Sequence, residues 1–293
     1  MYLPDIELHE AATLEEAAAL MARYAPNARM LAGGTDLLVD LKTKRVSADH
    51  IVSINRIDDL RGVTTTDAGL RIGALTTITQ LDRSPIVRQR FAPILDATGK
   101  MAAPQIRNMA TVGGNIACAV PCADLPPVLT VMNASVVLWS AGGQREVPLE
   151  EIFVGPRQTI IHNDEVLTAI LVPEPPPGSG AAYARFQLRD GNTIAVAAVA
   201  AGLRLDDDIV RDARVALGAV APTPKLVAAA AAALIGKTPD EAVFAQAADA
   251  AMKAAKPISD VRGSAQYRRE VVGVLTRRAL AAARHRAGDA RGT

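Results

Sequence analysis

Cysteine and aromatic residues are scarce in this sequence of 293 residues. It contains two cysteines, Cys118 and Cys122, and its aromatic content is 3%. Two cysteines are too few for a disulfide framework or for the four ligands of an iron–sulfur cluster. Few aromatic rings also disfavour the stacking platforms that bind single-stranded nucleic acid. We therefore expect no metal cluster in this chain, and we expect both cysteines to be small buried residues.

An excess of charge of one sign is also missing. Lys and Arg total 32 against 31 Asp and Glu, which leaves a net charge of +1. No field of that size draws a protein to DNA phosphates, so we expect no nucleic-acid partner. The longest apolar runs, Ile194–Leu203 and Leu226–Ile235, have about ten residues each, whereas a membrane-spanning helix needs about 20. The first residues lack the segments of a signal peptide, so we expect a cytoplasmic protein without a membrane span.

Common chemical motifs are absent as well. The sequence has no G-x-G-x-x-G dinucleotide fingerprint, no P-loop and no G-x-S-x-G nucleophile elbow. The four histidines are scattered and show no ligand spacing, so we expect surface or hydrogen-bonded residues and no metal ligands. They are His9, His50, His162 and His285.

Hydrophobic periodicity predicts a mixed α and β fold for the first part of the chain. The clearest element is a helix over Leu14–Tyr24, for which Thr13 and Glu16 have the capping-box spacing. Asp124 is an expected N-cap of a later helix. Strands are expected at Arg29–Ala32, His50–Ile54, Leu70–Ala74, Ser135–Trp139 and Glu165–Val172, and helices at Ile78–Leu81, Phe91–Gly99 and Val128–Met132.

A proline- and glycine-rich segment, Pro173–Gly180, is the best candidate for a linker. We place a domain boundary there, between residues 1–177 and 178–293. The second part reads as three strands followed by three helices, an α+β unit. The strands are expected at Tyr183–Leu188, Ile194–Leu205 and Ile209–Leu217, and the helices at Lys225–Ile235, Pro239–Lys253 (with Thr238 as N-cap) and Ser264–Arg286.

Two glycine-rich motifs suit the binding of an anion with several oxygens. They are Ala32-Gly33-Gly34-Thr35-Asp36-Leu37 and Thr111-Val112-Gly113-Gly114-Asn115-Ile116. Glycine lets backbone N–H groups approach a ligand closely, and consecutive N–H groups form a concave donor nest. Either motif alone is better explained as a chain turn, but two with similar flanks favour a dinucleotide bound between them.

Together with Gln105–Ala110 and Pro121–Pro127, these motifs resemble the FAD-binding medium subunit of the molybdenum hydroxylases, the family of xanthine dehydrogenase and aerobic carbon monoxide dehydrogenase. The resemblance covers nearly the whole chain. It implies a two-subdomain FAD-binding fold of the PCMH type, with subdomains of about 1–55 and 56–177, followed by a C-terminal α+β flavoprotein domain.

The resemblance also implies a set of cofactor-binding residues. Backbone amides of the first motif would bind the FAD pyrophosphate, and the second motif would complete the phosphate and ribityl side. Asp124 would accept hydrogen bonds from ribityl or ribose hydroxyls, although its N-cap reading is equally compatible. Leu167 would be an apolar wall, and Tyr183, which could also be ordinary core packing, would lie with Arg185 near the isoalloxazine, where lysine is usual at position 185. The full set is Ala32, Gly33, Gly34, Thr35, Asp36, Leu37, Thr111, Gly113, Gly114, Asn115, Asp124, Leu167, Tyr183 and Arg185.

The implied function is electron transfer within an oxidoreductase complex. A large molybdopterin-binding partner would oxidise substrate, a small partner with [2Fe–2S] clusters would carry electrons, and FAD on this chain would pass them to an external acceptor. The assembly implied is a dimer of heterotrimers, and no residue here need be a nucleophile or general base. A self-contained flavin oxidase or reductase and a flavin-free scaffold subunit remain alternatives.

Overall fold

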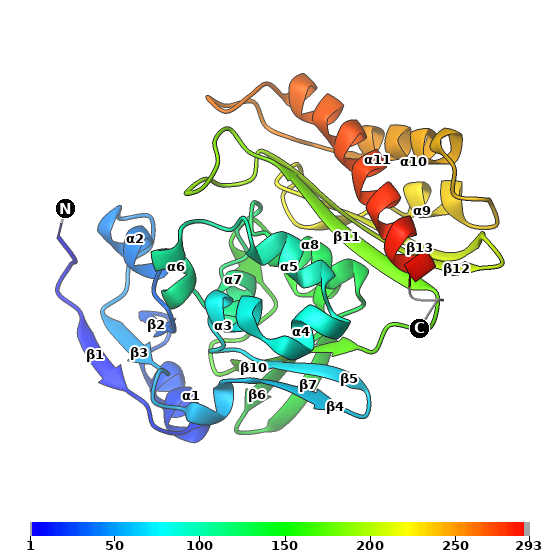
Figure 1. Ribbon diagram of the computed structural model, residues 1–293. Helices are drawn as coiled ribbons and strands as arrows, with labels where there is room; N and C mark the ends of the chain where they lie inside the picture. Colours follow the sequence, from blue (N-terminus) through cyan, green and yellow to red (C-terminus); the bar gives the residue numbers. More distant parts are fainter. Residues whose placement is uncertain (1, 290–293) are drawn as a thin grey trace.

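The computed structural model describes residues 2–289. Three larger β-sheets and the helices around them form a mixed α and β architecture, which confirms the predicted α+β class (Figure 1). Two of the sheets belong to the first part of the chain, and the third lies beyond the proline-rich segment.

The first sheet is parallel, with the strand order β1-β3-β2. Its strands are β1 (Glu7–Glu10), β2 (Ala28–Leu31) and β3 (His50–Ser53). Helix α1 (Leu14–Tyr24) packs against it, and its N-cap is Thr13, whose hydroxyl accepts a hydrogen bond from the Glu16 amide at 3.1 Å, as predicted. Helix α2 (Leu37–Lys42), which was not predicted, begins at the last residue of the first glycine motif.

The second sheet has five antiparallel strands in the order β4-β5-β10-β6-β7. They are β4 (Val63–Thr66), β5 (Gly69–Gly73), β6 (Ser135–Ser140), β7 (Gly143–Pro148) and β10 (Val166–Pro173). Six short helices connect β5 to β6: α3 (Ile78–Arg83), α4 (Pro85–Arg90), α5 (Pro93–Thr98), α6 (Pro104–Met109), α7 (Val112–Ala117) and α8 (Leu125–Val131). A small hairpin of β8 (Phe153–Gly155) and β9 (Gln158–Thr159) follows β7.

The third sheet has four strands, not the three predicted, in the order β11-β12-β13-β14. They are β11 (Ser179–Phe186), β12 (Ala197–Asp206), β13 (Ile209–Gly218) and β14 (Lys225–Leu226). Helices α9 (Ala228–Leu234), α10 (Glu241–Ala254) and α11 (Ala265–Asp289) gather on one side of this sheet, and α5 and α8 pack against it from the first part of the chain (Figure 1).

Two local predictions for this region were wrong. The helix expected from Lys225 begins at Ala228, because residues 225 and 226 pair with β13 instead. The N-cap of α10 is Asp240 rather than Thr238, since the Asp240 carboxylate accepts the Val243 amide at 2.8 Å. In both cases neighbouring residues compete for the helix start, and helix propensity alone does not decide which of them begins the helix.

The proline-rich segment is a short connection and not a loose linker. Strand β10 ends at Pro173 and β11 begins at Ser179, while Arg90 of α4 binds Glu174. Apolar residues from one face of the third sheet, such as Ala198 and Ala216, join the same buried cluster as β5, β6 and β10. The two parts of the chain are therefore packed through a common core.

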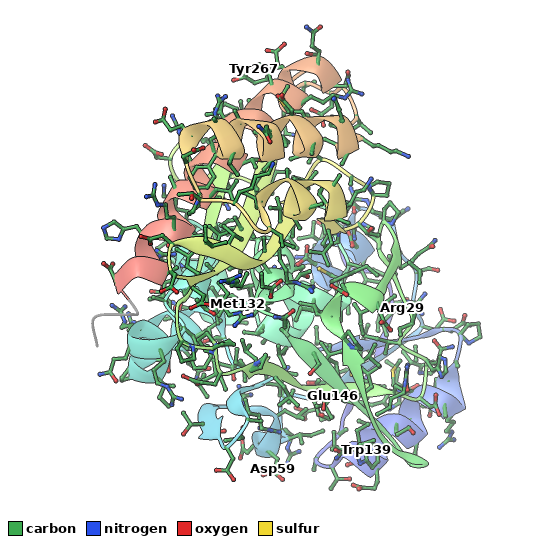
Figure 2. All side chains as sticks on the ribbon, turned by 90° about the vertical axis from the view of Figure 1, so that its right-hand side faces the viewer. Arg29, Asp59, Met132, Trp139, Glu146 and Tyr267 are labelled. Carbon is green, nitrogen blue, oxygen red and sulfur yellow. The ribbon has the colours of Figure 1, made fainter. Side chains whose placement is uncertain are left out.

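The long axis of the molecule runs from the second sheet to the C-terminal helices. Figure 2 shows Trp139 of β6 near one end and Tyr267 of α11 at the other. Among residues 2–289, no helix is long and apolar enough to cross a membrane.

Candidate functional site

The two glycine motifs meet in space. A Cβ atom built on Gly33 would lie 1.9 Å from the carbonyl oxygen of Met109, at the end of α6. Real side chains do not tolerate such a contact, so the loop after β2 can approach α6 only because residue 33 is glycine. Gly34, with φ +72°, then turns the chain in the left-handed region. The pair of glycines places the first motif against the segment that leads into the second.

The first motif offers unused backbone donors. The N–H groups of Gly33, Gly34, Thr35 and Asp36 make no hydrogen bond within residues 2–289. Consecutive unpaired N–H groups beside a helix start form a concavity that attracts anions. Asp36 does not cap α2 with its side chain. Partial burial by the surrounding loops raises the pKa of Asp36, whereas the positive charge of Arg157 lowers it. The Asp36 side chain still reaches the surface.

The second motif was predicted to be a loop, but it forms helix α7, with Thr111 as the N-cap. The Thr111 hydroxyl accepts the Gly114 amide at 3.1 Å, and the Gly113 amide donates to the Ala74 carbonyl at 2.8 Å. A Cβ on Gly113 would lie 2.7 Å from the Cβ of Ala74. These amides are already bonded, so Thr111 and Gly113 shape the helix start and its packing rather than forming a donor nest.

Asn115 is the member of the second motif that remains available. Its side-chain oxygen Oδ1 is buried and has no hydrogen-bond partner in the described residues. A buried polar atom without a partner is costly, and such atoms mark places where a missing group completes the bonding. Leu167 lies close to this helix, because α7 packs against β10 and both contribute to one core cluster.

Asp124 forms a buried network with Tyr183 and Arg185. The Tyr183 hydroxyl donates to Oδ1 at 2.7 Å, and Nη1 of Arg185 donates to Oδ2 at 2.7 Å. Asp124 occupies the N-cap position of α8, as predicted, but its side chain makes no capping bond and binds Tyr183 and Arg185 of β11 instead. Burial raises the pKa of Asp124, opposed by Arg185 and Tyr183, and burial together with the Asp124 charge raises that of Tyr183 well above its usual value.

Arg185 is a buried side chain that hydrogen-bonds to three different residues. Its side chain is 1% exposed, and besides Asp124 it donates to the Gln187 side chain and, at 3.0 Å, to the Thr193 carbonyl. A guanidinium has five N–H donors in a fixed plane, which a lysine could not replace bond for bond. Arg185 thus ties the start of α8 to the connection between β11 and β12.

The two cysteines are half-buried, not fully buried as predicted. Burial, with a further contribution from the Asp36 charge, raises the pKa of Cys118 to about 12. Burial also raises the pKa of Cys122, whose thiol feels the charges of Asp124, Arg262 and Asp36. The Cys122 thiol therefore lies within electrostatic reach of both Asp36 and Asp124.

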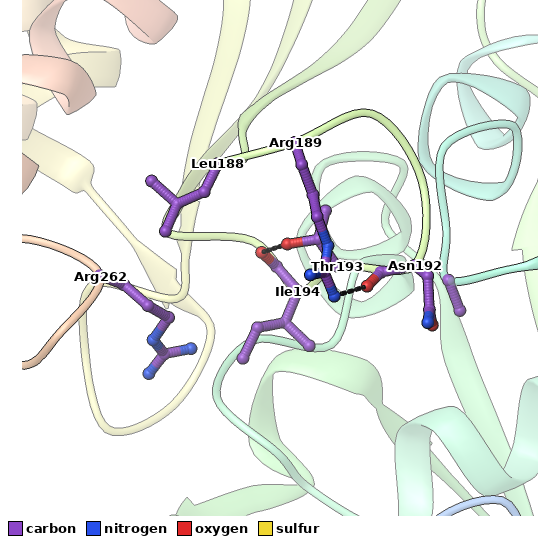
Figure 3. A pocket seen from close by; sticks show the side chains of 7 residues that line it. Leu188, Arg189, Asn192, Thr193, Ile194 and Arg262 are labelled. Carbon is purple, nitrogen blue, oxygen red and sulfur yellow. Dashed lines mark hydrogen bonds between the residues drawn. The ribbon is translucent and has the colours of Figure 1, made fainter.

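A cavity of about 400 Å³ is lined in part by Thr193, whose carbonyl accepts a hydrogen bond from Arg185. Figure 3 shows Leu188, Asn192 and Thr193 on the loop between β11 and β12, with Arg262 across the opening. The Asn192 amide donates to the Ala102 carbonyl at 3.0 Å, which closes one side. The full lining is Ala102, Leu188, Arg189, Asn192, Thr193, Ile194 and Arg262.

Sequence reasoning missed this cavity entirely. The turn at Gly191-Asn192 was a visible signal for the loop, but nothing in the sequence joins it to Ala102 or Arg262, which lie far away along the chain. Of the candidate residues, the structure places the first motif against the segment that leads into the second, and separately joins Asp124, Tyr183 and Arg185 in one network. It gives Thr111 and Gly113 local structural roles.

These residues fit FAD. The unpaired amides suit a pyrophosphate, the unpaired Asn115 oxygen suits a hydroxyl donor, and a cavity lined by apolar and polar groups suits a ring. Its buried carboxylate, Asp124, is paired with Arg185.

Comparisons with known proteins point to the same cofactor. Residues 4–175 match the family model of the FAD binding domain in molybdopterin dehydrogenase, and residues 181–283 match the CO dehydrogenase flavoprotein C-terminal domain. The carbon monoxide dehydrogenase medium chain of Hydrogenophaga pseudoflava is 35% identical over 283 residues, covering 97% of this chain and 98% of the relative.

Two further matches are equally extensive. The glyceraldehyde dehydrogenase medium chain of Sulfolobus acidocaldarius is 36% identical, over 96% of this chain and 99% of the relative. A crystal structure of carbon monoxide dehydrogenase from Hydrogenophaga pseudoflava superposes with a TM-score of 0.95 at 36% identity, over 98% of this chain and 99% of that one. The resemblance seen in the sequence is thereby confirmed, and the chain belongs to the family of FAD-binding medium subunits of molybdenum-containing hydroxylases.

Proposed function

We propose that this chain passes electrons from [2Fe–2S] clusters of a small partner subunit, through FAD, to an external acceptor. Bound FAD supplies the reversible uptake of electrons, and the protein supplies its position and electrostatic surroundings. The described residues offer no four-thiolate site, since the chain has two cysteines, and both thiols are shielded with raised pKa values. The electrons therefore enter from another chain.

The observation that carries this proposal is the row of unpaired amides from Gly33 to Asp36 beside α6. We assign the FAD pyrophosphate to this row, with Ala32, Leu37 and Gly114 as neighbours. Each net hydrogen bond to a charged group contributes about 1.5–3 kcal/mol, so several of them hold a diphosphate without a lysine. Asn115 would accept from a cofactor hydroxyl through its unpaired oxygen.

The remaining predicted residues would shape the other end of the site. The cavity beside Arg185 is the candidate place for the ring system, with Leu188 and Ile194 as apolar walls. Asp124 would act mainly through Tyr183 and Arg185, because each of its oxygens already accepts a strong bond. Leu167 would contribute by packing behind α7.

The proposed complex contains this chain, a large molybdopterin-binding subunit and the small [2Fe–2S] subunit, arranged as a dimer of heterotrimers in the cytoplasm. Relatives with similar identity are named for carbon monoxide and for glyceraldehyde. That range of substrates supports placing substrate specificity on the large subunit. We propose domain limits of 1–177 for the FAD-binding part, with subdomains of about 1–55 and 56–177, and 178–293 for the C-terminal part.

The test uses the full chain alone and with its two partners. The chain alone should bind one FAD, contain no iron or molybdenum by elemental analysis, and oxidise no aldehyde, purine or carbon monoxide with an artificial acceptor. Acid precipitation should release all flavin, because no residue is placed by motif for a covalent link. Adding both partners should restore substrate oxidation.

Two results would overturn the proposal. Turnover of an organic substrate by the chain alone would favour a self-contained flavin oxidase. A colourless chain that takes up no FAD, yet is required for the complex to assemble, would favour a flavin-free scaffold.

A further inference from the structure

We propose that Glu7, His9 and His50 form a binding site for a divalent transition-metal ion, of which Zn²⁺ is the best-suited common example. The site lies on the first sheet, among residues that the electron-transfer function does not use. Among residues 2–289, this is the one group of three or more possible ligands whose donor atoms lie within 4.8 Å of one another.

The strand register brings the three residues together. Glu7 and His9 are two positions apart on β1, so their side chains share one face of the sheet. The parallel pairing of β1 with β3 sets Glu7 directly beside His50. The two histidines are 41 residues apart in the chain, which is why the sequence showed no ligand spacing.

The distances suit one ion. Nε2 of His9 and Nδ1 of His50 lie 3.2 Å apart, and carboxylate oxygens of Glu7 lie 3.8 Å and 3.4 Å from these nitrogens. Two nitrogens bound to tetrahedral zinc at 2.0–2.1 Å are about 3.3 Å from each other. The histidine pair therefore needs little movement to hold an ion, and Glu7 is close enough to be the third ligand.

The imidazoles are held in place before any ion binds. The Tyr24 ring stacks on His50 with centroids 3.8 Å apart and on His9 at 4.8 Å, which restricts both rings. The histidine side chains are 14% and 22% exposed, whereas Glu7 is 63% exposed. An ion would thus meet two oriented nitrogens from the solvent side, with Glu7 free to swing in and water to fill the remaining position.

A bound ion would tie the edge strand β1 to the central strand β3, far along the strands from the glycine motif. Figure 1 shows β1 on the outer edge of this sheet. The first motif follows Leu31 at the carboxyl end of β2, whereas His50 pairs with Ala28 at the opposite end. Metal and flavin binding should therefore be independent.

The experiment titrates Zn²⁺ into the untagged, chelator-treated full chain by calorimetry, with Co²⁺ absorption to report the ligands. We expect one ion per chain and a rise in melting temperature on adding zinc. His50→Ala and His9→Ala should each weaken binding by at least about 100-fold, since loss of a ligand exceeds the 10–100-fold effect of outer-shell changes. Glu7→Gln should weaken binding while leaving the histidine contacts intact.

His162→Ala is the matched control, because His162 is 73% exposed and faces a single carboxylate, Glu165. It should bind zinc like the wild type. Flavin content and circular dichroism of every variant verify that the chain is folded. The proposal would be overturned if the wild type bound no zinc, or if the His9→Ala and His50→Ala variants bound zinc as tightly as the wild type.

Discussion

Asp124 and Arg185 form a buried ion pair between the start of α8 and strand β11, with Nη1 of Arg185 2.7 Å from Oδ2 of Asp124. Their side chains are 8% and 1% exposed. Charges this deep are tolerated only when every strong donor and acceptor has a partner. The pair therefore fixes the geometry on which the adjoining cavity depends.

Replacing Arg185 by methionine should destabilise the fold by about 3–5 kcal/mol, because it leaves the Asp124 carboxylate buried without its cation. Arg185→Lys keeps the charge but loses the bonds to Gln187 and Thr193, so its loss should be clearly smaller. Urea unfolding measures both. Equal destabilisation by methionine and lysine would contradict the importance of the charge.

The stability of the Arg185→Met variant should also depend on pH differently from that of the wild type. Burial already raises the pKa of Asp124 above its value in the unfolded chain, so folding favours the protonated carboxyl. Without the positive charge of Arg185, the folded chain favours the protonated Asp124 carboxyl more strongly. The stability deficit of Arg185→Met relative to wild type should therefore shrink as pH falls below the raised pKa, which urea unfolding at several pH values will reveal.

Gly33→Ala should empty the flavin site while preserving the fold. The new Cβ would meet the Met109 carbonyl at 1.9 Å, so the loop must move away from α6 and its amides lose their alignment. Losing two or more bonds of about 1.5–3 kcal/mol each should reduce flavin content to below about a tenth. Absorbance at the flavin band, with circular dichroism, measures the outcome.

Gly142→Ala is the control for this change. Its Cβ would lie 3.6 Å from the Ser140 hydroxyl, an ordinary contact in a hairpin turn remote from the motif. It should keep wild-type flavin content. Stoichiometric FAD in Gly33→Ala would remove this glycine from the site.

Cys118 should resist alkylation in the native chain. Its pKa of about 12 leaves almost no thiolate near pH 8, and the thiolate is the reactive form. Mass spectrometry after iodoacetamide treatment should find no adduct on Cys118, whereas the urea-unfolded chain should take up label on both cysteines. Rapid native labelling of Cys118 would show that the thiol is not shielded as described.

Glu165→Gln should lower stability by about 1–3 kcal/mol at neutral pH. Glu165 accepts two bonds from Arg145, at 2.6 and 2.8 Å, and these hold its pKa below the usual value. Because the pKa of Glu165 is lower in the folded chain than in the unfolded chain, Glu165 stabilises the fold at pH values above its unfolded pKa. This stabilisation is lost as the pH falls through its folded pKa. The difference from wild type should therefore narrow on acidification below about pH 4.5.

Glu174→Gln is the comparison, since its partner Arg90 and Glu174 itself are both 44% exposed. An exposed pair of this kind contributes about 0–1 kcal/mol. Denaturant midpoints of both variants and the wild type at two pH values give the loss of stability in each variant. An equal loss of stability in Glu165→Gln and Glu174→Gln would contradict a larger contribution from the Glu165–Arg145 pair.

Much of the architecture was determined by local sequence. The N-cap at Thr13, the apolar face of α1 and the strand patterns of β6, β10 and β13 are short-range signals, and the structure follows them. The two glycines of the first motif also have local reasons, since a Cβ on Gly33 would clash with the Met109 carbonyl and Gly34 has φ +72°.

The tertiary structure decided which members of each motif keep unpaired hydrogen-bonding groups. Gly113 packs on Ala74 and Thr111 caps α7, while Asn115 keeps an unpaired oxygen. Asp124 turned from its expected cap to Arg185, 61 positions later in the chain. His9 and His50 met only through strand register. Periodicity and capping are read within a few residues, whereas these contacts join distant segments whose approach depends on how the sheets and helices pack.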